Sequence, residues 1–319
     1  MAFQVQKAVR QKIYTKIALM APSGGGKTYG ALRLATGMAE EIKKETGKPA
    51  KILMGNTEKG RGIYYANEFD YDIVYIEPPH NPEKYVEFIN FAVAEGYDIL
   101  ILDSTSHEWE GKGGCLELHQ QAGGTYQSWG KVTPRHDKFI EAIAGAPIHI
   151  IATMRGKDQY ELSKDDKGKS TVQKLGVGAQ QRTGFEYEFT VTFLIDQKTN
   201  MAEPQKDNTH LFEGESILLS ENHGREIIIW ANSSKVEPVI KKDFTPEAPP
   251  AAETSSPNNE LLDIIAKIDT VAKLIGEKQG KDAVAAIIKK HHKNANYRSI
   301  KDIEIAIALL KDLEENDNE

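Results

Sequence analysis

Short apolar runs alternate with longer amphipathic stretches through the first two hundred residues of the chain. The apolar runs are bounded by turn residues and predict β-strands, whereas the stretches between them have the spacing of amphipathic helices. This alternation is typical of a parallel sheet with crossover helices. The predicted strands are 16–21, 50–56, 72–77, 98–103 and 148–154, and the predicted helices are about 27–45, 82–95 and 128–145.

The pattern changes after residue 155. Two alternating runs flank a polar, glycine-containing turn within 159–175, and the segment 185–196 alternates over most of its length. Strict alternation is typical of antiparallel strands, so we expect an antiparallel extension of the sheet. The runs 209–214 and 226–232 are candidates to continue that edge. The fold class is therefore α/β, with a mostly parallel sheet.

A proline-rich stretch, 243–259, separates this region from the end of the chain. It holds four prolines and few apolar residues, which predicts a flexible linker between a domain of residues 1–242 and one of residues 260–319. Beyond the linker, apolar residues recur at helical spacing and predict a small C-terminal helical domain with an acidic tail. The predicted apolar faces are Leu261, Ile264, Ile265, Ile268, Ala272 and Ile275, then Val284, Ile287 and Ile288, then Ile300, Ile303, Ile307 and Leu310.

The composition is that of an ordinary soluble protein, with 39% hydrophobic and 27% charged residues. A net charge of −7 argues against a uniformly positive surface that binds duplex nucleic acid, but local basic patches remain compatible with it. The single Cys115 excludes an internal disulfide framework and fits a reducing compartment. Because we find neither a signal peptide nor a membrane-spanning run, we expect a cytoplasmic protein with no membrane partner.

The stretch from Ala21 to Thr28 reads A-P-S-G-G-G-K-T between a predicted strand and a predicted helix. This is the phosphate-binding P-loop pattern, except that alanine replaces its first glycine. Backbone N–H groups of such a turn point at phosphates, the lysine adds a positive charge, and the threonine hydroxyl binds Mg²⁺. ATP and Mg²⁺ are therefore the expected cofactors. The expected nucleotide-binding residues are Pro22, Ser23, Gly24, Gly25, Gly26, Lys27, Thr28 and Tyr29.

Carboxylates at the ends of predicted strands complete this candidate site. Asp103 follows four consecutive apolar residues, as in a Walker B site, where the carboxylate orients Mg²⁺ together with Thr28. Hydrolysis also needs a group that polarises the attacking water, and both Glu58 and Glu77 end strands. We favour Glu58, because its strand directly follows the P-loop helix.

The order of these motifs resembles that of the RecA-like ATPase core. The P-loop, the strand ending in Glu58, ILILDS (99–104) and IIATMRGKDQY (150–160) lead into GVGAQQRTGFEYEFTVTFLID (176–196). The runs DSTSHEWEGKGG, ATMRGKDQY and QQRTGFEYEF resemble bacteriophage AAA-type ATPases that are grouped with RecA-like single-strand annealing and recombination proteins. The resemblance covers roughly residues 12–200.

This resemblance implies roles for further residues and for partners. Thr153 occupies the position that senses the γ-phosphate, although Thr153 and Met154 stand where the bacterial recombinase has an Asn-Gln pair. Arg182 is a candidate to reach a phosphate across a subunit interface, and a surface arginine before a strand explains it equally well. The family implies a homo-oligomer, either a ring or a filament.

A basic loop lies where a recombinase binds DNA. Between 155 and 182 basic residues outnumber acidic ones, which suits a salt-dependent contact with single-stranded DNA, although a solvated hairpin would explain the same charges. The candidate DNA-binding residues are Arg155, Lys157, Lys164, Lys167, Lys169 and Lys174.

Aromatic residues alternate with basic residues in 109–136. This pattern suits either stacking on single-stranded nucleic acid or packing of a helix on the sheet. We favour helix packing for Trp129. His107 and Glu108 lack a third ligand at a recognisable spacing, so they do not predict a metal site.

The sequence thus predicts a Mg²⁺-dependent ATPase with a RecA-like P-loop core that binds single-stranded DNA and promotes annealing or strand exchange. An ATP-gated adaptor or loader is the first alternative, with the C-terminal domain recruiting a helicase or a single-strand-binding protein. The second alternative is a small-molecule P-loop kinase, which would usually need an arginine-rich lid.

Overall fold

The computed structural model describes residues 7–58, 60–164, 170–234, 236, 281–291 and 302–317, together with positions 264, 268, 271, 272 and 275. The chain divides into two compact units, Met1–Pro246 and Glu247–Glu319, and each is described by itself. The predicted linker 243–259 lies outside the described residues. None of the helices in these described ranges is long and apolar enough to cross a membrane.

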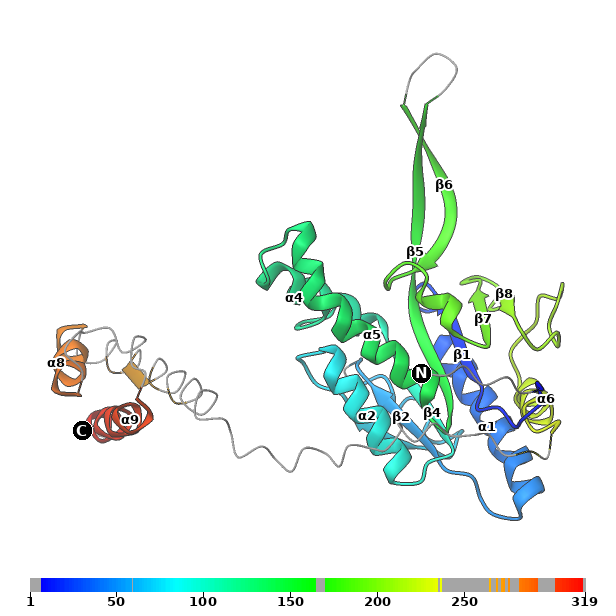
Figure 1. The fold of residues 1–319 in the computed structure, drawn as a ribbon, viewed down its shortest axis with the longest axis horizontal. Coiled ribbons are helices and arrows are strands. Elements are labelled where there is room, and N and C mark those ends of the chain that lie inside the picture. The colour runs from blue at the N-terminus through cyan, green and yellow to red at the C-terminus, as the bar shows by residue number, and fades with distance from the viewer. Residues whose placement is uncertain are drawn as a thin grey trace. The chain divides into compact units, whose positions relative to one another are not determined.

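The first unit is built on one large sheet, whose main path runs β3-β2-β4-β5-β1-β7-β8 (Figure 1). Neighbouring strands from β3 to β7 pair in parallel, and β8 pairs with β7 in the antiparallel sense. The α/β class with a mostly parallel sheet is confirmed. The strands are β1 (Lys16–Ala21), β2 (Ile52–Asn56), β3 (Asp72–Tyr75), β4 (Ile99–Asp103), β5 (His149–Lys164), β7 (Val191–Ile195) and β8 (Ala202–Asp207).

Strand β5 continues past the sheet and turns back as β6 (Ser170–Ala179), forming a long antiparallel hairpin. Its register runs from Gly156 opposite Ala179 to Lys164 opposite Ser170. Figure 1 shows this hairpin projecting away from the rest of the unit. The expectation of two alternating runs around a polar turn is confirmed.

Helices cover both faces of the sheet, and each face has its own apolar core. On one face, α1 (Lys27–Thr46) and α6 (Glu221–Ala231) pack on the strands, and on the other α2 (Pro82–Ala94) and α5 (Trp129–Gly145) do so. Shorter elements lie between these: α3 (Ser106–Glu110), α4 (Cys115–Gln121), and the 3₁₀ turns η1 (Tyr126–Ser128) and η2 (Phe185–Glu188). The expected helices 27–45, 82–95 and 128–145 thus correspond to α1, α2 and α5.

The helices α1 and α6 approach each other closely because a glycine stands at their contact. A Cβ atom on Gly37 would lie 1.8 Å from the carbonyl oxygen of Glu221. Since no real side chain tolerates such a distance, only glycine allows the two backbones to meet there.

The edge of the sheet beyond β7 differs from the sequence prediction. The run 226–232 is not a strand but falls largely within α6, whose buried positions 224, 227, 228 and 231 have helical spacing. Ser220 and His223 form a capping box that starts this helix, and consecutive apolar residues fit either element type. The run 209–214 is not a strand either, and 185–196 begins with η2 before β7, which pairs in parallel with β1. The antiparallel edge strand is β8, which the sequence analysis missed.

The second unit contains α8 (Lys281–His291) and α9 (Ile303–Asp317). Its core includes Ile264, Ile268, Ala272, Ile275, Ile287, Ile288, Ala306, Leu309 and Leu313. The predicted face of α9 was therefore wrong in part, since Ile307 is 50% exposed. The helix carries two adjacent apolar stripes with the same spacing, and spacing alone does not say which one is buried.

Candidate functional site

The P-loop lies between the end of β1 and the start of α1. Gly24 and Gly26 both have φ of +81°, a left-handed conformation that favours glycine. Gly25 is needed for another reason, because a Cβ there would lie 2.6 Å from the Cβ of Ala21. The missing side chain at Gly25 thus leaves room for alanine at the first position of the motif.

The amine of Lys27 contacts the first two residues of this loop. Its Nζ donates hydrogen bonds to the carbonyl oxygens of Ala21 and Pro22, at 2.9 and 3.0 Å. Burial lowers the pKa of Lys27, and the neighbouring carboxylates of Asp103 and Glu58 offset only part of that effect. Its present partners are neutral, so a phosphate oxygen would be a stronger acceptor for the same amine.

Asp103 lies at the end of β4, only 6% exposed, and accepts hydrogen bonds on both oxygens. The hydroxyl of Thr28 donates to Oδ2 at 2.7 Å, and that of Thr153 donates to Oδ1 at 2.5 Å. Burial raises the pKa of the Asp103 carboxyl, and the two hydrogen bonds oppose this only in part. Thr153 thus contacts the Walker B carboxylate directly.

The hydroxyl of Thr28 and the carboxylate of Asp103 fit Mg²⁺, which prefers hard oxygen ligands. Both hydroxyls bonded to this buried carboxylate are neutral, so a divalent cation would supply the positive charge that they lack. When bound, Mg²⁺ would neutralise charge that develops on the transferred phosphate.

Glu58 lies just past β2 and faces this site, whereas Glu77 does not. Oε1 of Glu58 accepts a hydrogen bond from Nη2 of Arg155 at 2.8 Å, and Oε2 of Glu58 accepts one from Nη1 of Arg61 at 3.2 Å. Burial raises the pKa of the Glu58 carboxyl, but the hydrogen bond and charge of Arg155, together with the charge of Arg61, hold that pKa below its ordinary value. Glu77 is exposed beyond the edge strand β3. The geometry therefore favours Glu58 for positioning water.

Two residues beside the P-loop, Gln197 and Asn200, were not predicted from the sequence, and a third, Tyr29, was predicted only as part of the motif. Nε2 of Gln197 donates to the carbonyl oxygen of Ser23 at 2.7 Å, and a Cβ on Gly26 would lie 3.2 Å from Oδ1 of Asn200. Both belong to the turn between β7 and β8, which no local motif marks. Tyr29, a predicted nucleotide contact, packs edge-to-face against Tyr65 and Phe69 and stays partly exposed.

A buried hydrogen-bond network is centred on Glu108, which lies on α3, the helix that follows β4. Its carboxylate accepts from Sγ of Cys115 at 3.0 Å, from Nδ1 of His136 at 3.0 Å and from Nε2 of Gln181 at 3.2 Å. Glu108, Cys115 and His136 are also close enough to ligate one metal ion. The sequence found no third ligand because the partners of Glu108 come from three other elements. Three donors already satisfy this carboxylate, so hydrogen bonding accounts for its burial.

The predicted DNA-contacting residues divide into three groups. Arg155 is paired with Glu58, and Lys157 is exposed near the base of the hairpin. Lys164 and Lys174 lie on β5 and β6, where only the backbone is described, and Lys167 and Lys169 lie outside the described residues. Arg182 instead contacts α5, since its Nη1 donates to Oδ1 of Asp137 at 2.9 Å.

This arrangement places an anion-binding loop, a lysine, an oxygen-ligand pair and a carboxylate at the carboxyl edge of a parallel sheet. Those groups are the ones that nucleoside triphosphate hydrolysis requires. A family model described as an AAA domain matches residues 13–227, which is more than half of the chain. A search of curated proteins found no match.

Proposed function

Because the chain belongs to the AAA domain family, whose members are nucleotide-binding ATPases, we propose that it is a Mg²⁺-dependent ATPase that binds single-stranded DNA. We propose further that it promotes single-strand annealing or strand exchange, as its resemblance to phage recombination ATPases implies. It would work as a homo-oligomer in the host cytoplasm, and its C-terminal unit would be the site that recruits a single-strand-binding protein or a helicase.

One observation carries the proposal that DNA and hydrolysis are linked. Arg155 is the residue at which β5 leaves the sheet to form the hairpin, and its guanidinium binds the carboxylate of Glu58 at 2.8 Å. The candidate DNA-binding element and the candidate catalytic carboxylate are therefore joined by one ion pair. A ligand bound at the base of the hairpin would therefore be separated from the candidate hydrolytic site by a single side chain, that of Arg155.

In the proposed reaction, Lys27 and the loop amides bind the phosphates, and Thr28 and Asp103 hold the metal. Glu58 orients the attacking water and accepts its proton. Thr153 keeps the Asp103 carboxylate in place through its hydrogen bond.

The test is ATP hydrolysis measured with and without an oligo(dT) strand over a salt series. We expect stimulation by DNA that weakens as salt rises, because phosphate contacts release counterions. Lys27→Ala should abolish turnover. Glu58→Gln should lower it by about 10²- to 10⁴-fold while nucleotide still binds, whereas the exposed control Glu77→Gln should behave like the unchanged protein.

Replacing Lys164, Lys167 and Lys169 by glutamine should remove the stimulation, and the same changes at Lys43, Lys44 and Lys48, at the far end of α1, should not. Turnover that ignores DNA in every variant would refute the DNA-coupled ATPase. DNA-independent turnover would favour the adaptor function if removal of residues 258–319 also abolished recruitment of a partner. It would favour the kinase function if turnover required a small phosphate acceptor.

A further inference from the structure

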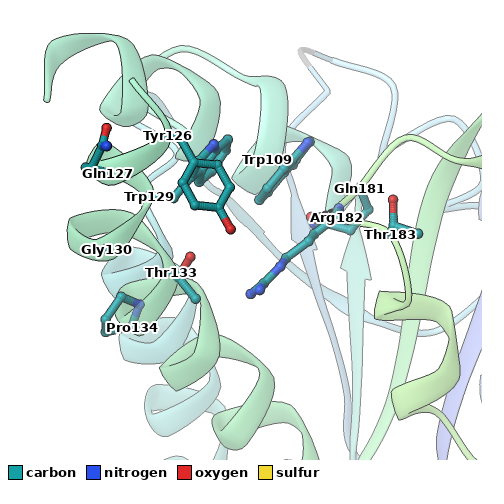
Figure 2. A pocket seen from close by; sticks show the side chains of 10 residues that line it. All are labelled: Trp109, Tyr126, Gln127, Trp129, Gly130, Thr133, Pro134, Gln181, Arg182 and Thr183. Carbon is teal, nitrogen blue, oxygen red and sulfur yellow. Dashed lines mark hydrogen bonds between the residues drawn. The ribbon is translucent and has the colours of Figure 1, made fainter. Parts of the chain in front are cut away.

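An open groove lies beside the base of the hairpin, outside the nucleotide site. It has a volume of about 960 Å³ and is formed by α3, by the segment from η1 into α5, and by the residues that follow β6. Figure 2 shows its side chains, with Arg182 extending across the hollow toward α5. Its floor is fixed, since the buried Gln181 donates to the carbonyl oxygen of Thr105 at 3.0 Å and to Glu108.

Aromatic rings form one side of this groove. Trp109 and Trp129 lie nearly parallel, with their centroids 5.5 Å apart and their planes 9° apart, and Trp129 stacks in turn on His119 at 4.1 Å. These contacts account for the buried faces of both tryptophans. Trp109 also contacts His136 edge-on, with the centroids 5.4 Å apart, and both tryptophans line the groove.

Tyr126 is the most informative of these residues, because its ring is 89% exposed. A ring so exposed contributes little to the stability of the fold. Its backbone is nevertheless well held, since Thr125 and Ser128 form a capping box around η1. The fold therefore presents an exposed aromatic ring, on a backbone that is held in place, at the rim of the groove.

The charge of the groove suits a nucleic acid strand. Among the residues that the structure describes, none that lines the groove is acidic. Arg182 contributes a guanidinium whose side chain is 40% exposed and which also pairs with Asp137 of α5 at 2.9 Å. Arg182 also lies at the base of the hairpin, because it comes soon after β6 and the amide of the nearby Gln180 donates to the carbonyl oxygen of Arg155 at 2.7 Å. A strand that follows the basic hairpin would thus reach the aromatic wall.

We propose that this groove binds bases of single-stranded DNA, which stack on Tyr126 and contact Trp109 while Arg182 contacts a neighbouring phosphate. The proposal rests on the proposed function and assigns a second contact to the same ligand. Stacking on aromatic rings accepts any base, because every base has a π-face. An exposed ring beside a partly exposed guanidinium favours this ligand over an apolar peptide, which would gain nothing from the positive charge of Arg182.

The experiment compares Tyr126→Ala with Tyr187→Ala, a control that removes another exposed tyrosine from outside the groove. Binding is followed by anisotropy with labelled oligo(dT) and with an abasic strand of the same length. Loss of one stack should weaken oligo(dT) binding by about 5- to 100-fold in Tyr126→Ala and leave binding of the abasic strand unchanged. Tyr187→Ala should match the unchanged protein on both strands.

Two more measurements separate the base contact from the phosphate contact. In a Trp230→Phe background, which leaves Trp109 and Trp129 as the only tryptophans, oligo(dT) should quench the fluorescence and the abasic strand should not. Arg182→Gln should lower the salt dependence of binding by about one phosphate contact on both strands.

The outcomes distinguish this inference from the proposed function. If the unchanged protein binds neither strand, both are overturned. If it binds oligo(dT) but Tyr126→Ala binds equally well and the tryptophans are not quenched, only the groove proposal is overturned. Equal weakening on the two strands would also overturn it, because that result shows no contact with bases.

Discussion

The hydrogen bond from Thr153 to Asp103 allows a quantitative test of how the site is held. Thr153→Val keeps the shape of the side chain and removes only the hydroxyl, which leaves Oδ1 of a 6%-exposed carboxylate without the donor at 2.5 Å. Hydrogen bonds to charged groups contribute about 1.5–3 kcal/mol, so we expect the free energy of unfolding to fall by that amount. Urea denaturation measures it.

The matched control is Thr192→Val, on β7, which is separated from β5 by β1. Thr192 is as buried as Thr153, but its hydroxyl donates to the neutral carbonyl oxygen of Glu186 at 2.7 Å. Its loss should cost only about 0.5–1.5 kcal/mol. Only Thr153→Val should also weaken Mg²⁺-dependent binding of a fluorescent ATP analogue, because only Thr153 orients Asp103.

The pH dependence gives the same test a second readout. Burial raises the pKa of the Asp103 carboxyl, and loss of the Thr153 bond should raise that pKa further. The bond favours the ionised form, so its contribution is fully present above the higher pKa that Asp103 has in Thr153→Val, and it is lost as the pH falls through the pKa of Asp103 in the unchanged folded protein. Equal costs for Thr153→Val and Thr192→Val, unchanged with pH, would refute the reasoning.

Three other properties follow from the packing of the first unit. Gly37→Ala should destabilise by about 1–3 kcal/mol because its Cβ meets the Glu221 carbonyl at 1.8 Å, whereas Gly130→Ala, with nothing within 4 Å, should change stability by less than about 1 kcal/mol in the same urea assay. Burial lowers the pKa of Lys16 from 10.5 to about 7, so the unfolded chain holds this proton more tightly and stability should rise with pH between those values, a rise that Lys16→Met should flatten. Burial raises the pKa of the Cys115 thiol, so a thiol reagent should label it only at the rate of unfolding.

The parts of the site that depend on neighbouring residues could be predicted from the sequence. The P-loop is one such part, because its glycines, Lys27 and Thr28 are consecutive and the backbone turn fixes their geometry. Asp103 is another, since the end of a buried strand lies at the edge where parallel sheets hold their ligands. The hairpin was predictable because alternation and a polar turn are local signals.

Contacts that need the finished fold could not be predicted in this way. The donors to Glu108 come from Cys115, His136 and Gln181, and they meet only when α4, α5 and the end of β6 have packed. The groove has the same origin, since its two walls are distant in sequence. The prediction of a strand at 226–232 was wrong for a different reason. Consecutive isoleucines suit either a strand or a buried helix, and packing against α1 favours the helix.

Under the proposed function, the position of Arg155 offers a direct route from the hairpin to the candidate catalytic carboxylate. Its amide donates to Oγ of Ser106 at 2.9 Å, which ties the base of the hairpin to the turn after Asp103, while its guanidinium holds Glu58. A carboxylate paired with arginine is a weaker base, since the positive charge keeps its pKa low. In the proposed mechanism, displacement of the Arg155 side chain would raise the pKa of Glu58 and make it a stronger base. If the proposed function holds, one side chain would convert a movement at the base of the hairpin into a change in the reactivity of the site.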